Sequence, residues 1–497
     1  MLTNLDDLLI ASMNTPAVVI LLLVIGVTLF ISENMAKAKW MPVVLARKIV
    51  HIVAVTAVAV SPAFFANQWL LAAIVAGFTG LLCWAVATNK LAIDESRSRK
   101  SWGIVLFPIA FLLLLAFFGR SKPWLVIYPM LVLAWADAAA AIVGETFAKR
   151  YFSLTGDRKS LVGSATFFIT SFLLLWLLPY SLSLFHPVFQ WPQPSHFGYT
   201  WLVLLTFVAI VAAAAEALGS GGLDNLLVPL FVAWGMEVMI LPDGLAGCVM
   251  AIVLVILFGV LAFRKKWLDA GGAVAAALLG VVLWVAGGMV VVIPVLLFFF
   301  SGSLLGKLPR KAISDAKHNK PRDWAQVAAN GGLGGVLIMA DTFFPSHTLL
   351  MAYFVSVAVC TADTWSSEIG QWAGGKVVDI VRCTPLQAGL SGGISWQGTV
   401  GGLMGATAIG LACYWMAEFN GTQVAIIIAF GFTGMLADSV LGSIFQGRFL
   451  LANGTLTEDR SLANGKAPQK GWRWMTNDTV NWLSNLLMVA AYLIFCW

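Results

Sequence analysis

The chain has 497 residues, of which 60% are hydrophobic and only 11% are charged, and its formal net charge at pH 7 is +6. Apolar runs of about 20 residues recur along the whole length, and this is the length that an α-helix needs to cross a bilayer. The composition excludes a soluble globular protein and a nucleic-acid-binding protein. It indicates an all-α, polytopic transmembrane protein.

We expect about sixteen membrane-spanning helices, arranged in two tandem helical domains that cover residues 1–243 and 244–497. Such spans must be helical, because hydrocarbon offers no partner to an unpaired backbone N–H or C=O group. In chain order, the expected spans are 14–32, 49–66, 69–87, 103–119, 123–143, 161–182, 201–218, 225–241, 244–263, 269–286, 288–306, 326–341, 346–362, 398–416, 422–441 and 479–496.

The lysines and arginines are distributed unevenly between the loops that join these spans. All of them except Arg120 and Lys122 fall in alternate loops, so they share one face of the membrane. Because basic loops stay in the cytoplasm, we expect both termini to face out and the long polar loops to face the cytoplasm of a bacterial plasma (inner) membrane. A membrane enzyme with a cytosolic cosubstrate needs only one polar face, whereas a transporter usually needs polar groups at both faces or at the midplane.

Two early features are candidates for chemistry. In ARKIVHI (46–52), Arg47 and Lys48 precede His51 on one side of a helix. His51 is a candidate base for an alcohol, although an interfacial histidine gives the same pattern. In the apolar run LAWADAAAAIVGE, Asp137 is a bare carboxylate, which either serves a functional site or belongs to a structural polar pair.

The loop GDRKSLVGS (156–164) follows and directly precedes a span. Its Lys159 and Ser160, with Gly163 and Ser164, offer a cation, hydroxyl groups and backbone N–H groups at a helix start, a combination that binds phosphate. The loop is not a Walker A sequence. A basic loop that only anchors the topology is the alternative interpretation.

Three carboxylates of this half are candidate ligands of one metal ion. Glu216 has the same two interpretations as Asp137, because it also lies in an apolar run. Asp224, which is followed by Asn225, opens a span and is either a ligand or a helix N-cap. A Mg²⁺–nucleotide complex takes one or two carboxylates plus phosphate oxygens, so Asp137, Glu216 and Asp224 suit such a site.

The second half carries a comparable series of polar residues in the same order. A basic loop leads into a Gly-rich helix, two acids end a span, a Gly-rich turn opens the next helix, and further acids follow. The candidate residues are Lys320, Arg322, Asn330, Asp363, Glu368, Gly392, Gly393, Ser395, Asp438 and Asp478. The order predicts two related sites in tandem, with Asp137 corresponding to Asp363 and Glu216 to Asp438.

Residues of about 40–235 resemble the dolichol kinase and phytol kinase family of CTP-dependent lipid-alcohol kinases. The resemblance lies in R-K-x-x-H (47–51), D-x-x-A (137–140), K-S-x-x-G-S (159–164) and the later E…D-N, which ends at Asn225. The segment K-S-L-V-G-S departs from the family at Val162, where a Glu is usual.

Residues of about 250–497 resemble a different membrane family, of phytyl-phosphate kinase type, which includes an uncharacterised transmembrane protein of animals. The matching stretches are RDWAQVAANGG (322–332), ADTWSSEIG (362–370), GGISWQGT (392–399), A-D-S-x-L-G (437–442) and N-D-x-V-N (477–481). One departure is Gly-Leu-Ser at 389–391, where the family has G-T-N.

Together the resemblances imply a bifunctional kinase for the salvage of isoprenoid alcohols of the phytol, geranylgeraniol or farnesol type. Such an enzyme phosphorylates the alcohol to its monophosphate and then to its diphosphate, with Mg²⁺ and a nucleoside triphosphate, expected to be CTP. The implied catalytic residues are His51, Asp137, Lys159, Asp363 and Asp438, and the implied metal ligands are Asp137, Glu216, Asp224, Asp363, Glu368, Asp438 and Asp478. Nucleotide and substrate phosphate would contact Arg47, Lys48, Ser160, Gly163, Ser164, Asn225, Lys320, Arg322, Asn330, Gly392, Gly393 and Ser395.

Two other classes stay open at this stage. One is a cytidylyltransferase that forms a CDP-lipid, and it differs from a kinase by releasing pyrophosphate. The other is a transporter of lipid or ions, which the shortage of charge on the outer face disfavours. The expected partners are membrane lipids and a nucleotide, and no nucleic acid is expected.

Overall fold

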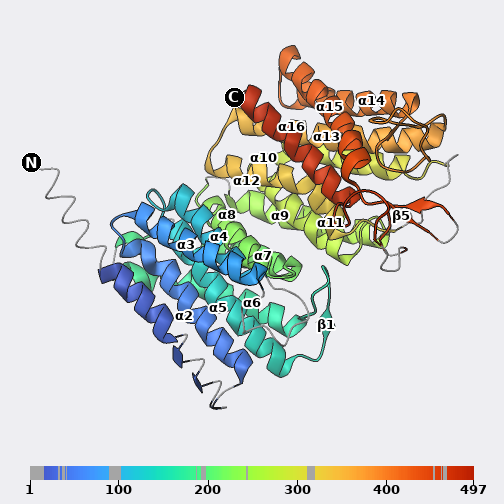
Figure 1. Cartoon of the computed structure of the whole chain (residues 1–497). Helices are drawn as coiled ribbons and strands as arrows, with labels where there is room; N and C mark the ends of the chain where they lie inside the picture. Colours follow the sequence, from blue (N-terminus) through green and yellow to red (C-terminus); the bar gives the residue numbers. More distant parts are fainter. Residues whose placement is uncertain are drawn as a thin grey trace, which may run out of the picture. The chain divides into compact units, whose positions relative to one another are not determined.

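The computed structural model describes residues 16–28, 30, 31, 34, 35, 38, 40, 42–88, 102–185, 187–191, 198–241, 244–309, 320–451, 454–460, 462 and 467–496. Within them the chain is almost entirely helical, and it forms two compact units, residues 1–248 and 249–497 (Figure 1). The described strands form three short antiparallel pairs in the loops, and a few isolated β-bridges lie outside them. The all-α class predicted from composition is therefore confirmed.

The first unit is organised around one buried helix. Its elements are α2 (Val43–Val60), η1 (Ser61–Ala63), α3 (Gln68–Ala87), α4 (Gly103–Phe118), α5 (Trp124–Phe147), β1 (Tyr151–Phe152), β2 (Lys159–Ser160), α6 (Leu161–Ser183), η3 (Pro187–Phe189), α7 (Tyr199–Leu218) and α8 (Asp224–Val238), preceded by an apolar helix over Pro16–Thr28. Helix α5 is apolar on all sides over its first half, as expected of a helix surrounded by others, and it contacts α2, α4, α6 and α8.

The hairpin β1–β2 connects α5 to α6 and sets the position of a predicted site loop. Tyr151 pairs with Ser160, and Phe152 pairs with Lys159. The Ser160 hydroxyl then accepts a hydrogen bond from the backbone N–H of Gly163 (3.0 Å), which makes Ser160 the N-cap of α6. Lys159 is thereby held directly before the first turn of a long helix.

The second unit is organised around α13 in a similar way. Its elements are α9 (Gly244–Arg264), α10 (Ala270–Leu305), α11 (Trp324–Val327), the π-helical turn η5 (Ala328–Gly332), α12 (Leu333–Phe343), α13 (His347–Ala373), β3 (Val378–Asp379), β4 (Gly393–Ile394), α14 (Trp396–Met416), α15 (Gly421–Phe445), β5 (Phe449–Leu450), β6 (Leu456–Thr457) and α16 (Asn477–Phe495). Helix α13 contacts α10, α12, α14, α15 and α16.

Glycines allow α13 and α14 to approach each other closely. A Cβ atom on Gly401 would lie 3.0 Å from the backbone oxygen of Trp365, and one on Gly405 would lie 2.9 Å from that of Thr361. Small residues spaced one turn apart are a common device for packing membrane helices without side chains between them. The contact fixes the part of α13 that carries Asp363.

The predicted number of about sixteen spans is not confirmed. Within the described residues, ten helices are long and apolar enough to cross a membrane, and three further apolar helices are shorter. The predicted spans 269–286 and 288–306 are merged in α10, which is kinked at Gly288 (φ 59°, ψ −150°). Helix α8 has 15 residues and α12 has 11, so both are shorter than the roughly 20 residues that a perpendicular span requires.

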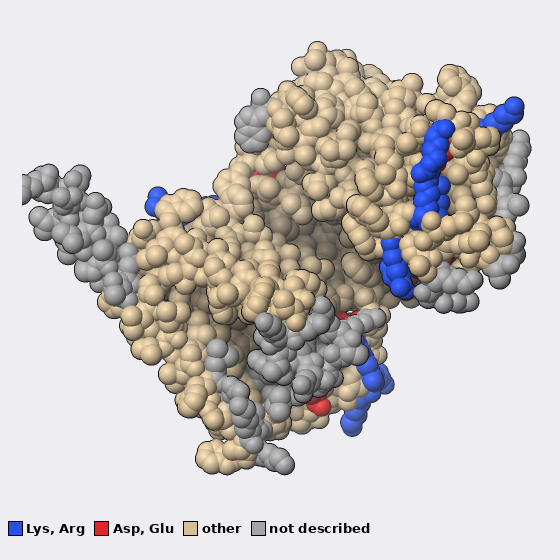
Figure 2. Space-filling view, viewed as in Figure 1, with Lys and Arg blue, Asp and Glu red and all other residues tan. Residues whose placement is uncertain are grey.

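Charged side chains occupy little of the surface. On the face shown in Figure 2, lysine and arginine side chains gather beside the β1 hairpin of the first unit and around the β5 loops of the second. In each unit, basic groups therefore collect where the loops carry polar sequence.

Candidate functional site

The first unit brings distant charged residues together at one place, which we call the first cluster. Lys48 donates to Oδ2 of Asp137 at 3.0 Å, and Nε2 of His51 lies 3.8 Å from the same oxygen. These residues come from α2 and α5. The other members come from β2, α7 and α8, so the complete first cluster is Lys48, His51, Asp137, Lys159, Glu216 and Asp224.

Lys159 is the cation at the centre of the second part of this cluster. Its Nζ lies 2.6 Å from Oε1 of Glu216 and 3.3 Å from Oδ2 of Asp224, and it also donates to the backbone oxygen of Glu216. The side chains are 14%, 11% and 20% exposed for Lys159, Glu216 and Asp224. Burial alone would lower the pKa of the Lys159 ammonium, but Asp224 and Glu216 raise it above its ordinary value. Lys159 is therefore positively charged.

His51 is positioned to accept a proton. It forms a hydrogen bond with the backbone of Leu133, and its Nε2 is buried without a hydrogen-bond partner among the described residues. Asp137 interacts electrostatically with Lys48 and His51 and also with Lys159, so the two parts of the cluster share one electrostatic environment. A ring nitrogen beside a carboxylate and without another partner is suited to general base catalysis.

Most of the other predicted residues of this unit make local contacts that stabilise the helices and their ends. Ser160 caps α6, and Ser164 donates to Oε2 of Glu216 over 3.5 Å. The backbone N–H of Asn225 donates to Oδ1 of Asp224 (3.1 Å). Arg47 belongs to α2, but its side chain lies outside the described part of the chain.

The backbone frame of the first cluster is held by a close contact between α5 and α6. A Cβ atom on Gly144 would lie 2.8 Å from Oγ of Ser160, and one on Gly163 would also lie 2.8 Å from it. Gly144 is seven residues after Asp137, on the same side of α5. Neither glycine can carry a side chain without moving the capping serine.

The second unit repeats this arrangement, which we call the frame: an aspartate, a glycine seven residues later and a serine that caps the next helix. Gly370 is seven residues after Asp363, and a Cβ atom on it would lie 3.1 Å from Oγ of Ser395. Ser395 caps α14 through the backbone N–H of Gly398 (3.1 Å), three residues later, as Ser160 caps α6. The strand β4 precedes this cap just as β2 precedes the first one.

A second group of polar residues lies around Asp363 of α13, and we call it the second cluster. Oδ2 of Asp438 accepts a hydrogen bond from Ser484 (3.0 Å) and, with the amide of Asn481 oriented to donate, another from Asn481 (3.2 Å). Cys360 donates to the backbone oxygen of Asn330 (3.1 Å). With Asn485, which donates to Sγ of Cys360, the members are Asn330, Cys360, Asp363, Asp438, Asn481, Ser484 and Asn485.

The second cluster carries an acidic pair without a basic partner. Asp363 and Asp438 interact with each other, and no lysine or arginine of the described residues forms an ion pair with either. Two neighbouring carboxylates repel each other when both are ionised, and a bound cation or a proton on one of them relieves that repulsion. The pair therefore has the composition of a cation site.

The other predicted residues of the second unit lie around this pair or farther along the loops. Arg322 stacks over the ring of Phe299 (5.0 Å) and interacts electrostatically with Glu368. Lys320 is exposed just before it. Asp478 lies in the first turn of α16.

The predicted Gly-rich turn has a packing role. Gly392 has φ 85°, and a Cβ atom on it would lie 2.5 Å from that of Ser443. Ser443 in turn donates to Oδ1 of buried Asp379 (2.7 Å). Gly393 pairs with Asp379 in the β3–β4 hairpin. These residues join the hairpin to α15, and Ser395 serves as a helix cap.

The candidate residues from the sequence did not include the polar side of α16, although the stretch N-D-x-V-N (477–481) ends at Asn481. Asn481, Ser484 and Asn485 lie at positions i, i+3 and i+4, so they share one side of that helix and face the second cluster. This spacing in an otherwise apolar helix was a readable signal.

The oxygen-rich composition of both clusters suits Mg²⁺, although neither forms a complete protein cage. Among the described residues, no group of three or more histidine, cysteine, aspartate or glutamate side chains is close enough to hold a metal ion. Mg²⁺ usually takes only one or two carboxylates and completes its shell with water and phosphate oxygens. The pair Asp363 and Asp438 fits this requirement best, because the carboxylates of the first cluster are already bound by lysines.

Comparison with known proteins places the chain among membrane proteins of related sequence. Residues 253–489 match the family described as integral membrane protein DUF92. A phytol kinase of Synechocystis sp. is 30% identical over 217 residues, which are 42% of this chain and 87% of that protein. An uncharacterized membrane protein of Methanocaldococcus jannaschii is 29% identical over 205 residues (41% and 85%), and the protein PGR of Arabidopsis thaliana is 26% identical over 226 residues (40% and 78%). No solved structure gives a significant match.

Proposed function

Because the chain belongs to a phytol-kinase-like family of integral membrane proteins, we propose that it phosphorylates a prenyl alcohol twice, first to the monophosphate and then to the diphosphate. The phosphoryl donor is a nucleoside triphosphate, with CTP as the expected one, and Mg²⁺ is the expected cofactor. The first cluster serves the first step and the second cluster the second step, both at the cytoplasmic side of a bacterial plasma membrane.

One observation carries this proposal. The two units place an aspartate, a glycine seven residues later and a serine-capped helix in the same arrangement, yet they surround it with different charges. The first cluster has Lys48 and Lys159 bound to its acids, whereas the acids of the second have no basic partner among the described residues. Similar frames with different charge support related reactions on different acceptors.

The first step uses a neutral acceptor, so it needs a base and a cation. The alcohol oxygen attacks the terminal phosphorus of the donor, its proton passes to Nε2 of His51, and the nucleoside diphosphate leaves. Lys159 neutralises charge on the transferred phosphoryl group, and Lys48 keeps Asp137 ionised beside His51.

The second step uses an acceptor that is already an anion, so it needs neutralisation more than a base. A phosphate oxygen of the prenyl monophosphate attacks the terminal phosphorus of the second nucleotide, and the nucleoside diphosphate leaves as the bond to its bridging oxygen breaks. Arg322 binds the acceptor phosphate. Asp363 and Asp438 are the residues that would hold Mg²⁺. When bound, the ion would supply positive charge that neutralises the phosphates.

The test is a product analysis with purified protein in lipid nanodiscs, a labelled prenyl alcohol and Mg²⁺–CTP. The wild type should form the diphosphate and release CDP. Asp137→Asn should lose turnover of the alcohol but keep that of a supplied monophosphate, and Asp363→Asn should accumulate the monophosphate. Unchanged product distributions in both variants would refute the assignment of the sites. Release of pyrophosphate would instead identify a nucleotidyl transferase.

A further inference from the structure

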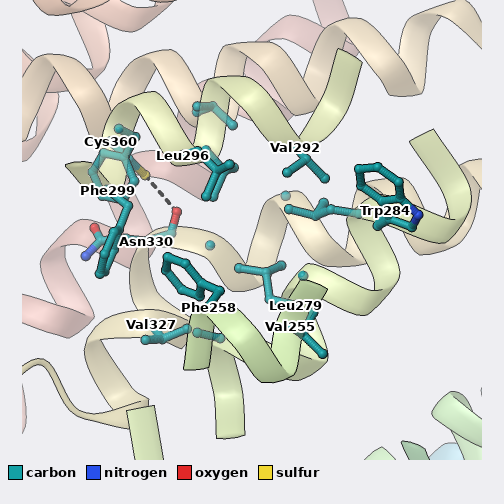
Figure 3. A pocket seen from close by; sticks show the side chains of 18 of the residues that line it. Val255, Phe258, Leu279, Trp284, Val292, Leu296, Phe299, Val327, Asn330 and Cys360 are labelled. Carbon is teal, nitrogen blue, oxygen red and sulfur yellow. Dashed lines mark hydrogen bonds between the residues drawn. The ribbon is translucent and has the colours of Figure 1, made fainter. Parts of the chain in front are cut away.

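A cavity of about 310 Å³ lies inside the second unit, between α9, α10, α13 and the segment that contains η5 and α12. Its walls are almost entirely apolar, and aromatic and branched side chains project into it (Figure 3). Its size is at the lower end of the range for ligand sites, about 300–1,000 Å³. Examples of its lining residues are Val255, Phe258, Leu279, Val292, Leu296 and Phe299.

Glycines let the walls of the cavity pack closely against one another. Gly280, Gly331 and Gly334 line the cavity, and they come from different helices. A Cβ atom on Gly331 would lie only 2.4 Å from a methyl group of Leu279, so a side chain there would displace the wall. These glycines therefore help to set the positions of the side chains that form the walls.

One end of the cavity is polar and adjoins the second cluster. Arg322, Asn330 and Cys360 line this end, and Asn330 and Cys360 are themselves members of the second cluster. Ser356 also lines the cavity, is fully buried, and has no hydrogen-bond partner among the described residues. A cation and an amide thus lie where the cavity approaches the second cluster, and Ser356 adds a hydroxyl to the lining.

The opposite end is apolar and reaches the surface. In Figure 3, Trp284 lies at the end away from Asn330 and Cys360. The kink of α10 at Gly288 follows within about one helical turn of Trp284. Leu254 and Met289 line the cavity and are also exposed, so they form an apolar rim. In a membrane this rim would face the hydrocarbon.

We infer that this cavity holds the hydrocarbon chain of the phosphorylated acceptor, with its phosphate at Arg322 and Asn330 and its far end at Trp284. The inference rests on the proposed function, and it adds the site of the chain and the residue that limits its length. An apolar cavity with one cationic end fits a lipid monophosphate, with the chain against the apolar walls and the phosphate at the cation.

The first experiment locates the chain directly, without turnover. Purified wild-type protein is labelled with a prenyl monophosphate that carries a photoreactive diazirine at the end of its chain, and the labelled peptides are identified by mass spectrometry. We expect labelling of the α10 segment around Trp284, and competition by unlabelled geranylgeranyl monophosphate but not by phosphatidic acid. Labelling confined to other helices, or competition by phosphatidic acid alone, would overturn the inference.

The second experiment tests the length limit with variants. Val292→Trp fills the cavity and should raise KM for geranylgeranyl monophosphate at least ~10-fold. Trp284→Ala should shift the preference toward longer chains. Leu304→Trp is the matched control, because Leu304 lies on α10, is exposed and is not part of the lining, and it should change neither value. An unchanged chain-length preference in both cavity variants would overturn the inference.

These readouts separate the inference from the proposed function. Labelling near Trp284 in a protein that does not phosphorylate the bound lipid would leave the cavity assignment standing and remove the kinase. Phosphorylation with labelling elsewhere would do the reverse.

Discussion

Replacing Lys159 by methionine tests the charge balance of the first cluster. Methionine keeps most of the apolar stem and removes the ammonium group, so Glu216 and Asp224 lose the cation that lies between them at 2.6 and 3.3 Å. Breaking a buried ion pair by removing one partner costs about 3–5 kcal/mol. Because the three side chains are 11–20% exposed, we expect the lower end, about 3 kcal/mol, in the free energy of unfolding.

The same substitution should lower kcat of the first phosphorylation by more than the loss of folded protein explains. Removing one preorganised donor from a developing anion typically lowers kcat by about 10²- to 10³-fold. The monophosphate-to-diphosphate step depends on the second cluster and should keep its rate in the same protein. The assay measures both steps separately, by supplying alcohol or monophosphate with Mg²⁺–CTP.

Lys122 provides a matched control in the same unit. It forms an ion pair with Glu237, whose side chain is 7% exposed. Only Pro123 separates Lys122 from the first residue of α5. Along α5, it lies about 20 Å from the level of Asp137, far from the first cluster. Lys122→Met should therefore lower stability by a similar amount and leave the kinetics of the folded protein unchanged.

The comparison of the two variants decides the role of Lys159. Unfolding is followed in detergent by intrinsic tryptophan fluorescence, and kcat is normalised to the folded fraction. If Lys159→Met and Lys122→Met show the same normalised kcat for the alcohol, Lys159 has only a structural role and the reasoning is refuted.

Three further predictions concern the second unit. Gly392→Ala should lower the free energy of unfolding by about 2–4 kcal/mol, since its Cβ atom would lie 2.5 Å from that of Ser443 and its φ is 85°. Gly389→Ala is the control, because Gly389 has φ 90° in open space and should lose only about 1–2 kcal/mol through backbone strain. A similar loss in both variants would contradict the packing argument. Burial opposes ionisation of Asp379, but hydrogen bonds from Ser443 and from backbone N–H groups hold its pKa below 3.8. The ionised carboxylate therefore stabilises the fold above that pH, and this stabilisation is lost as the pH falls through the lowered pKa. The thermal unfolding of Asp379→Asn should converge with that of the wild type only below about pH 3.8. Mg²⁺ without nucleotide should raise the Tm of the wild type and not that of Asp363→Asn, and an equal rise in both would exclude the acidic pair as the binding site.

The sequence predicted local features of the candidate sites better than their assembly. The start of α14 at Ser395 and the start of α6 at Ser160 were predictable, because a hydroxyl before a run of helix-forming residues caps the helix. The ion pairs of Lys159 were not, because its partners are 57 and 65 residues away and no local pattern selects between lysines. The metal ligands and the nucleotide contacts stay predictions.

The number of spans is not confirmed for a related reason. Hydropathy measures the composition of a segment, and it does not report where a helix bends or ends. Gly288 interrupts α10 without ending it, and the π-helical turn at Ala328–Gly332 separates α11 from α12. The cavity was also not predictable from the sequence, because its walls come from helices that are distant in sequence.

One substitution between the two frames explains much of their difference in charge. Lys159 directly precedes the capping serine of α6, and Ile394 occupies the equivalent position before Ser395. An isoleucine cannot neutralise the acids of α13 and α15 as Lys159 neutralises those of the first cluster, so we expect a bound cation to balance the pair Asp363 and Asp438. An acceptor that brings its own phosphate charge is best served by such a site, because the bound cation and Arg322 together balance charge that an alcohol does not carry. Restoring a lysine by Ile394→Lys should therefore weaken Mg²⁺ binding at the second cluster, and a tighter or unchanged Mg²⁺ affinity would contradict the correspondence between the two frames.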